Sequence, residues 1–293
     1  YYTRTELVRH LVRGAVGPAF DRHLAEVRRL ADTDPAAAGV RLFDFHVLDP
    51  ACGSAHFLVE VLDELADKIA ALVGELPLPA VAEALDDLRR GAGPSFGAGV
   101  EDTALLKRLV LKRCVYGVDV SPMGAEIAKV SLWLASFVPG LSLAYLDGNV
   151  QVGNSLIGVA RPEEVAPPGD GGQVVMFGDD LSEAVRRAAE AAAKLRAIED
   201  RTPDEVERSR RAHASLRARV RGAKRVFDLW TAEPLGLREA RDEALRHGAE
   251  ILDAAPSLLA DRAEALADAE RALHWPIAFP AAFHRTNPGF DAV

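Results

Sequence analysis

The stretch 47–57, with the sequence V-L-D-P-A-C-G-S-A-H-F, constrains the fold of this chain more than any other segment. A short apolar run, 43–48, ends on Asp49 and is followed by a turn of small residues. From Phe57 onward, apolar residues recur at helical spacing. The pattern predicts a strand, a tight loop and a helix, and open α/β sheets bind their ligands at such a junction.

The loop has the composition of a site in which a ligand lies directly against the backbone, because Ala51, Gly53, Ser54 and Ala55 are all small. No Lys follows the glycine as in a phosphate loop, and the loop lacks the G-x-G-x-x-G spacing of a dinucleotide fingerprint. We therefore expect a nucleoside with an amino-acid tail to fit this loop better than a triphosphate.

Composition limits the class of protein. The 293 residues are 49% hydrophobic, which is enough for a core, and the net charge of -9 excludes a uniformly basic nucleic-acid binder but not a local basic face. Cys52 and Cys114 fit neither a metal-ligand spacing nor a disulfide framework, so we expect a reducing cytoplasm and no metal site. The sequence shows no signal peptide and no apolar run of about 18 residues, so no membrane span is expected.

A second strand is predicted at 114–118, ending in Asp119, with Ser121 as N-cap and Pro122 as the first residue of the next helix. An acid at this position can accept hydrogen bonds from both ribose hydroxyls of a nucleoside, although Asp119 taken alone is also compatible with an ordinary helix start. Four apolar residues of the helix are expected on its buried face: Ile127, Val130, Leu134 and Phe137.

A third strand is predicted at 141–146, followed by a turn at 147–149 and the sequence G-N-S-L-I-G at 153–158. We expect Asn154 and Ser155 to lie where this strand leaves the sheet, so that Asp49, Asp119 and Asn154 surround one pocket. A plain Asn-Ser turn is the alternative interpretation.

Together these segments resemble the motifs of adenine-specific N6 DNA methyltransferases, in particular the large type IIG restriction and phage-defence branch. The sequence of residues 49–57 is similar to the family's D-P-A-C-G-S-G-x-F motif, which holds S-adenosylmethionine, and residues 117–122 resemble its G-x-D-x-S-P segment. G-N-S-L-I-G resembles the third motif, which contacts the adenine of the cofactor. Residues 1–3, Y-Y-T, resemble a Y-Y-T-P element that closes over the methionine end.

The resemblance implies an α/β fold, with a Rossmann-like methyltransferase sheet and a helical insertion, and S-adenosylmethionine as cofactor. Ala55 stands where the family has Gly, so a positive φ at this position would cost about 1 kcal/mol or more. The cofactor contacts that the resemblance implies are Tyr2, Thr3, Asp49, Ala51, Cys52, Gly53, Ser54, Phe57, Asp119, Val120, Asn154 and Ser155.

Changes in composition predict four segments. They are a cofactor-binding core at 1–160, a Pro/Gly-rich linker at 161–180, a helical insertion at 181–273 and a return to the core at 274–293. Within the insertion we expect two antiparallel helices, the second starting at a capping box, Thr202–Glu205, and a further helix from about Ala249 to Leu273. Residues 31–39 and 74–100 are expected to be loops or short insertions.

The insertion carries a basic run, with eight Lys or Arg and no acid from Arg208 to Arg225. Guanidinium groups along a DNA backbone replace condensed counterions, whereas a merely solvated helical face is the alternative interpretation. The candidate contacts to double-stranded DNA are Arg208, Arg210, Arg211, Arg217, Arg219 and Arg221.

The chain looks truncated at both ends. Residues 274–280 and 290–293 resemble the H-W-P-x-x-F-P segment and the F-D-x-V strand that precede the family's catalytic N-P-P-[YFW] motif, so we expect that motif after Val293 and no catalytic residue before it. The sequence N-P-G-F at 287–290 precedes the strand and is expected to be a turn. The implied partner is the rest of the methyltransferase polypeptide, including its target-recognition domain.

The implied function is methyl transfer from S-adenosylmethionine to N6 of a flipped adenine, by a site-specific DNA methyltransferase of a restriction-modification or phage-defence system. The amine attacks the sulfonium methyl in line, so catalysis is mostly positioning and electrostatics. We expect this chain to be the cofactor-binding portion and inactive alone. The alternatives are a methyltransferase acting on RNA or protein and a non-catalytic interaction module, which Ala55 supports.

Overall fold

The chain folds as two compact units, and the computed structural model describes residues 3–165, 178–285 and 287–293. Each unit has a hydrophobic core of its own. The first unit comprises Tyr1–Val150, Arg196–Arg210 and Gly289–Val293, and the second comprises Gln151–Leu195 and Arg211–Pro288.

A small sheet has its first two strands in the first unit, and its third strand, Val150–Val152, contains the boundary between the two units. Strands β1 (Val47–Asp49) and β2 (Val115–Asp119) are parallel, and the sheet order is β1-β2-β3, with β3 at Val150–Val152. A parallel bridge joins Val47 to Ala292, and the Leu48 N–H donates to the Ala292 carbonyl at 3.0 Å. The segment Gly289–Val293 therefore extends the order to β3, β2, β1 and then this segment.

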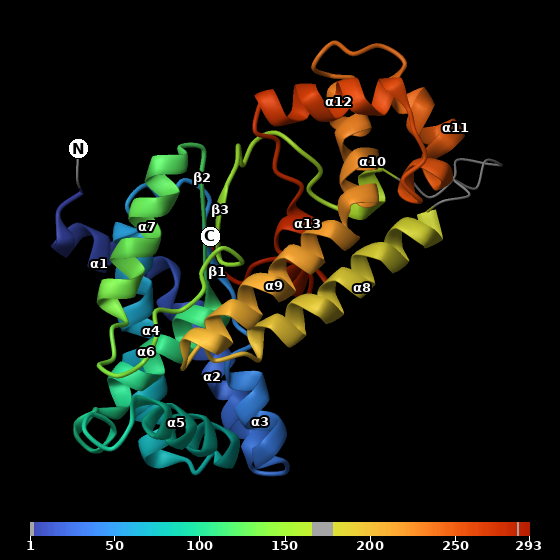
Figure 1. The fold of residues 1–293 in the computed structure, drawn as a ribbon. Coiled ribbons are helices and arrows are strands. Elements are labelled where there is room, and N and C mark those ends of the chain that lie inside the picture. The colour runs from blue at the N-terminus through green and yellow to red at the C-terminus, as the bar shows by residue number, and fades with distance from the viewer. Residues whose placement is uncertain (1–2, 166–177, 286) are drawn as a thin grey trace. The chain divides into compact units, whose positions relative to one another are not determined.

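Helices surround the strands of the first unit (Figure 1). Helix α4 (His56–Glu75) packs on β1 and β2, which confirms the predicted strand, loop and helix. Helix α1 (Thr5–Ala15) packs against α4, and α7 (Pro122–Ala135) contacts both β2 and α4. The remaining helical elements of this unit are α2 (Gly17–Ala31), α3 (Pro35–Leu42), α5 (Pro79–Ala92), a 3-10 turn at Gly97–Gly99 and α6 (Asp102–Cys114).

One expectation about this unit, that residues 31–39 and 74–100 form loops, is wrong. Much of 31–39 and 74–100 is helical, since α3 and α5 both begin with a proline, which suits the first turn of a helix. Helix α1 begins at Thr5, and Arg4 is its N-cap.

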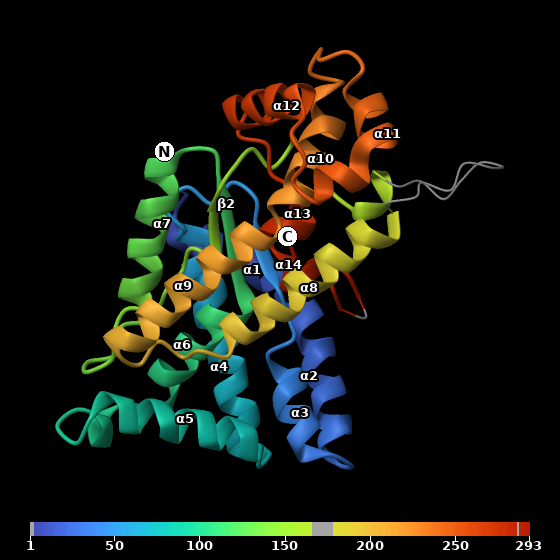
Figure 2. The same ribbon diagram turned by 45° about the vertical axis from the view of Figure 1, so that its right-hand side comes forward.

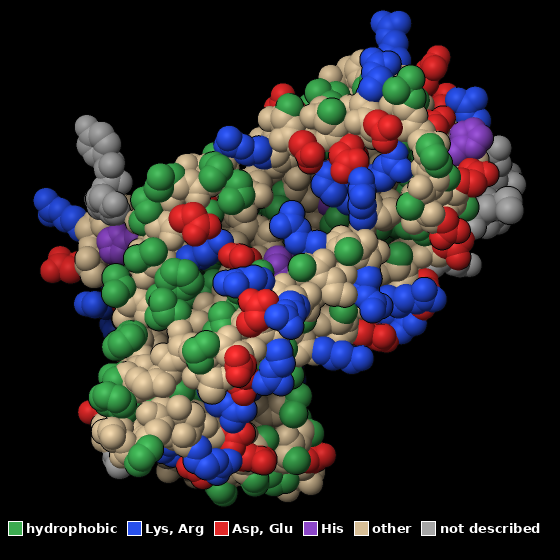
Figure 3. All heavy atoms as spheres, viewed as in Figure 1, with side chains coloured by type: hydrophobic (Ala, Val, Ile, Leu, Met, Phe, Trp, Pro, Cys, Tyr) green, Lys and Arg blue, Asp and Glu red, His purple; other side chains and the backbone are tan. Residues whose placement is uncertain are grey.

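The predicted buried face of α7 is also wrong. Leu134 is 75% exposed and Phe137, just beyond the helix, is 56% exposed, whereas Ala125, Ala128 and Leu132 are buried. The alanines allow α7 to lie close to β2, and this places the bulkier stripe outward. Figure 3 shows apolar side chains gathered over α7. The exposed apolar residues of this stripe include Met123, Ile127, Val130, Leu134 and Phe137.

Residues 141–146 form no strand, contrary to the prediction, because their backbone bonds to another segment. The Ser142 N–H donates to the Arg201 carbonyl at 3.1 Å, and the Tyr145 N–H donates to the Asp200 carboxylate at 2.8 Å. The third strand is β3 instead, directly after the predicted turn at 147–149.

The segment Arg196–Arg210 is attached to the first unit by a buried ionic network. Asp200 is fully buried and accepts hydrogen bonds from Lys112 of α6 and from Ser209. Arg108 donates to the Asp200 carbonyl at 2.6 Å. Burial lowers the pKa of Lys112 and the Asp200 carboxylate opposes this shift. Because Lys112 is itself buried, water cannot compensate the charge of its ammonium group, and the Asp200 carboxylate does so instead.

The second unit is helical. Helices α8 (Gly178–Arg196) and α9 (Pro203–Arg219) run side by side in Figures 1 and 2, although the residues of α9 up to Arg210 belong to the first unit. Within the second unit, the buried Ala188 and Ala192 of α8 pack with Leu216 of α9. The Thr202 hydroxyl accepts from the Glu205 N–H at 3.3 Å, so the predicted cap is present. The Glu205 carboxylate, however, accepts from the Arg201 N–H instead of closing a full capping box.

The end of the predicted insertion contains two helices where one was expected. Helices α11 (Ala240–Leu252) and α12 (Leu258–Ala269) are separated by a turn, and Ser257 caps α12 by accepting from the Ala260 N–H at 3.2 Å. Both pack against α10 (Arg221–Ala232). The shorter elements are a 3-10 turn at Pro162–Glu164, α13 (Trp275–Ala278) and α14 (Pro280–Phe283). Among the described residues, no helix is long and apolar enough to cross a bilayer.

Candidate functional site

The loop between β1 and α4 is held against the end of β2. The Cys52 N–H donates to the Val118 carbonyl at 2.9 Å, and the Ala51 N–H donates to the Asp49 carboxylate at 3.0 Å. Gly53 has a φ of 51°, and a Cβ added to it would meet nothing within 4 Å. The loop therefore presents open backbone at the carboxyl ends of two parallel strands, where α/β sheets bind ligands.

Asp119 organises both this loop and the start of α7. One carboxylate oxygen accepts from the Gly53 N–H at 2.8 Å, and the other accepts from the Ser121 N–H at 2.8 Å. The predicted Ser121 cap is confirmed, since its hydroxyl accepts from the Gly124 N–H. A carboxylate has about four acceptor positions, so half-buried Asp119 can still accept from two ligand hydroxyls.

The carboxylates at the two strand ends, Asp49 and Asp119, are close enough to affect the pKa of neighbouring groups. Burial raises the pKa of Asp49, and the negative charge of Asp119 raises it further. Burial and both carboxylates raise the pKa of the Cys52 thiol to about 12, so Cys52 is an inert packing residue and not a nucleophile. A site with two carboxylates side by side favours a ligand that brings hydroxyl donors or positive charge.

Gly117 and Ala55 fix the shape of the loop. A Cβ at Gly117 would lie 2.9 Å from the Leu58 side chain and 3.0 Å from the Cys52 sulfur, so glycine lets the loop approach β2. Ala55 precedes α4 with a φ of 65°, in the left-handed region, and its side chain is buried. The positive φ that makes alanine unfavourable at this position of the motif is therefore present, and Ala55 is strained.

An apolar pocket of about 290 Å³ lies beside Asp49. Its walls come from α1, from the start of α4 including Phe57, and from Val293. Nothing in the sequence marked Leu11 and Val12 of α1 as wall residues, because helix packing alone explains their spacing. The lining residues are Leu11, Val12, Ala15, Val16, Val47, Leu48, Asp49, Pro50, Phe57, Leu58, Val61 and Val293.

The other predicted cofactor contacts are placed as follows. Ser54 is half-buried in the loop, Val120 is exposed after β2, and Thr3 is half-buried ahead of α1. Tyr2 lies outside the described residues. Asn154 and Ser155 form a turn in the second unit, where the Asn154 side chain accepts from the Leu156 N–H at 3.1 Å. That Asn154 shares a pocket with Asp49 and Asp119 stays a prediction.

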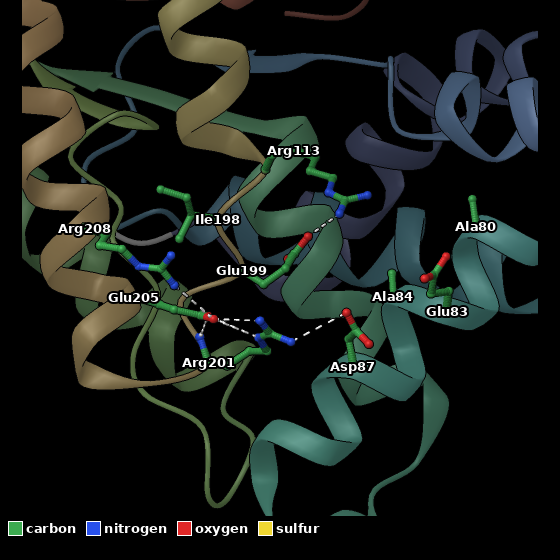
Figure 4. Close-up of a pocket in the computed structure, with 11 residues that line it drawn as sticks. Ala80, Glu83, Ala84, Asp87, Arg113, Ile198, Glu199, Arg201, Glu205 and Arg208 are labelled. Carbon is green, nitrogen blue, oxygen red and sulfur yellow. Dashed lines mark hydrogen bonds and ion pairs between the residues drawn. The ribbon is translucent and has the colours of Figure 1, made fainter.

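A second pocket of the first unit, of about 350 Å³, is lined by charged side chains, most of which form ion pairs (Figure 4). Arg201 lies 2.7 Å from Glu205 and 3.5 Å from Asp87 of α5. Arg208 points toward Glu205 at 3.4 Å, and Arg113 pairs with Glu199. These ion pairs attach the segment Arg196–Arg210 to α5 and α6, so the pocket has a structural explanation.

The predicted DNA-contact residues differ in their surroundings. Arg208 and Arg210 belong to the first unit and are ion-paired, with Arg210 lying 2.9 Å from Glu207. The others belong to the second unit and are exposed: Arg211, Arg217, Arg219 and Arg221. Across the described part of the chain, no group of three His, Cys, Asp or Glu side chains is placed to hold a metal ion.

Comparison with known proteins adds one relative. Over 121 residues the chain is 32% identical to a protein of Methanocaldococcus jannaschii named "putative type II restriction enzyme and methyltransferase". The chain is similar to a restriction-modification methyltransferase. The similarity covers 38% of this chain and spans 8% of the length of that protein. No family model and no solved structure matches the chain.

Proposed function

We propose that this chain is the S-adenosylmethionine-binding portion of a site-specific adenine-N6 DNA methyltransferase of a restriction-modification or phage-defence system. The observation that carries the proposal is the pairing of Asp49 and Asp119 at the ends of adjacent parallel strands, with the Gly53 N–H held by Asp119. The loop, the second carboxylate and the helix start occur in the order that the motif resemblance implies.

The acceptor groups of this site fit the proposed cofactor. Asp119 keeps acceptor capacity for the two ribose hydroxyls, and the space above Gly53 is open. The cofactor carries a sulfonium and an ammonium, and the negative charges of Asp49 and Asp119 favour such a cation. The bound cofactor would supply the methyl group, while the residues of this chain bind and orient it.

The strand order also supports the proposal. From β1 the chain adds β2 and β3 on one side, whereas the segment Gly289–Val293 lies on the other side of β1. The order in which strands are added to the sheet therefore reverses at β1. Doubly wound sheets of order 3-2-1-4 bind their ligands outside the carboxyl ends of the strands at such a switch point, and this is where Asp49 lies. This order is what a Rossmann-like methyltransferase sheet requires.

The reaction class and the biological role rest on different supports. A role in restriction-modification follows from the similarity to the Methanocaldococcus jannaschii protein, whose name includes both a restriction enzyme and a methyltransferase. Adenine N6 as the acceptor and duplex DNA as the partner follow from the motif resemblance. In the family that the motifs resemble, an N-P-P-aromatic motif accepts the amine protons, and the 293 residues contain no such motif.

Calorimetric titration with S-adenosylmethionine tests the proposal. We expect saturable binding to the wild-type chain and a loss of at least about tenfold in affinity for Asp119→Ala, since two hydrogen bonds to a charged acceptor are removed. Asp67→Ala, an exposed acid on α4, is the matched control and should bind like the wild type. No heat at millimolar cofactor would contradict the proposal and favour the non-catalytic alternative.

A further inference from the structure

Seven of the eight cations of the basic run fall into two groups in the structure, and the eighth, Arg211, has an interaction of its own. Arg208 and Arg210 are ion-paired to glutamates of their own helix, as Figure 4 shows for Arg208. Arg225 is buried and donates to Asp261 at 2.5 Å, and Lys224 lies 2.8 Å from Asp228. These four side chains already have carboxylate partners inside the protein.

Arg217, Arg219 and Arg221 make up the second group. All three are exposed, and within the part of the chain that the structure describes they make no ion pair or side-chain hydrogen bond. The helix dipole accounts for Arg217 and Arg219, which lie in the last turn of α9. It does not account for Arg221, the first residue of α10, because a cation is disfavoured at a helix N-terminus.

Two of these arginines, Arg217 and Arg221, line a concave surface in the second unit. The pocket has a volume of about 700 Å³ and includes the following charged residues in its lining: Arg217, Arg221, Lys224, Arg271, Glu264 and Asp268. Both acids lie near cations, since Asp268 is 3.0 Å from Lys224 and Glu264 is 3.9 Å from Arg225. The pocket therefore retains an excess of positive charge, carried by Arg217 and Arg221.

We propose that Arg217, Arg219 and Arg221 bind phosphate groups of a duplex DNA backbone, and that Arg208 and Arg210 do not. The choice of DNA rests on the proposed function, whereas the choice of arginines rests on their lack of internal partners. A guanidinium donates two parallel hydrogen bonds to the oxygens of a phosphodiester. Each such interaction releases condensed counterions, so it contributes to the salt dependence of binding.

The salt dependence of DNA binding by the whole chain tests this assignment. Fluorescence anisotropy with a labelled duplex, between about 50 and 200 mM salt, gives the slope of log K against log salt. We expect replacement of Arg217, Arg219 and Arg221 by Ala to reduce the slope by about 0.9 for each phosphate that is no longer neutralised. The matched control, Arg208→Ala with Arg210→Ala, should leave the slope unchanged, and lysine at the three positions should restore it.

An unchanged slope in the triple variant would overturn the assignment, and so would an equal fall in the control or no binding of duplex DNA by the wild-type chain at low salt. Tighter binding of a duplex RNA would assign the surface to another class of partner and would also overturn it. Calorimetry with S-adenosylmethionine on the same variants separates the two proposals. Cofactor binding without DNA binding contradicts only the arginine assignment, and DNA binding without cofactor binding contradicts the proposed function. Circular dichroism confirms that each variant is folded.

Discussion

The carboxylate of Asp119 accepts a hydrogen bond from the backbone N–H of Gly53 at 2.8 Å, across 66 residues of sequence. This contact ties the loop that follows β1 to the end of β2. The other carboxylate oxygen of Asp119 accepts from the Ser121 N–H, so one side chain positions both the loop and α7. The arrangement places a ribose-binding carboxylate and an open glycine backbone at the same point, and the proposed function depends on it.

Replacement of Asp119 by Asn should destabilise the first unit as well as weaken cofactor binding. The amide retains only one acceptor oxygen for two backbone donors, so one N–H loses a charge-assisted bond. Such bonds contribute roughly 1.5–3 kcal/mol each, and we expect a loss of that order in urea unfolding. Asp67→Asn, a substitution of the same kind on the surface of α4, should stay within about 0.5 kcal/mol of the wild type.

Asp49 should give the chain a measurable pH dependence. Its pKa is raised in the folded state, so the folded chain binds this proton more tightly than the unfolded chain. Its contribution to stability is therefore fully present below the ordinary aspartate pKa of about 3.9 and is lost as the pH rises through the raised value. We expect Asp49→Asn to be more stable than the wild type near neutral pH. The difference in the free energy of unfolding between the two should become smaller toward about pH 4. A gap that widens on acidification would refute this.

Ala55→Gly should have a small effect. Relief of the left-handed strain at a φ of 65° stabilises the variant by about 1 kcal/mol, whereas loss of the buried methyl group costs about 0.8 kcal/mol. We expect the free energy of unfolding to change by less than about 1 kcal/mol. Because the Ala55 side chain faces the interior, cofactor affinity should change little. Binding that appears only in the variant would instead indicate a decayed site.

The register of α7 can be tested with two leucines. Leu132 is fully buried and Leu134 is 75% exposed. Leu132→Ala should therefore cost about 2–5 kcal/mol in denaturant unfolding, whereas Leu134→Ala should stay within about 0.5 kcal/mol of the wild type. A larger loss of stability for Leu134→Ala than for Leu132→Ala would show that α7 buries the face expected from the apolar spacing.

The buried pair of Lys112 and Asp200 should be costly to break. Asp200→Ala leaves the Lys112 ammonium uncompensated in the interior, and we expect a loss of about 3–5 kcal/mol. Asp204→Ala, at an exposed position in the first turn of α9, should cost less than about 1 kcal/mol. Addition of Lys112→Met to the Asp200 variant should recover part of the loss, because it removes the unpaired charge. Equal losses for the two aspartates would show that the network adds no stability.

Local patterns predicted the elements that depend on local causes. The loop after β1 and the Ser121 cap follow from small residues and a capping side chain next to apolar runs. The stretch 141–146 could not be predicted in this way, because its backbone donors find Asp200 and Arg201 far along the chain. Helix α7 has apolar residues on two faces, so spacing alone could not show that Leu132 packs inward and Leu134 does not.

The candidate site was partly predictable for the same reason. Asp49 and Asp119 could be paired from the sequence, because each ends a short apolar run and parallel strands bring such ends together. The contribution of α1 to the apolar pocket could not be predicted, since Leu11 and Val12 look like ordinary packing residues. The division of the basic run was also invisible, because it depends on which arginines meet Glu205 and Glu207.

Hydrogen–deuterium exchange with and without S-adenosylmethionine tests the central claim most directly, because it locates the cofactor on the chain. We expect slower exchange at the loop amides from Ala51 to Ala55 and around Asp119, and no change at α5 or α12. Protection confined to other segments, or none at saturating cofactor, would contradict the account.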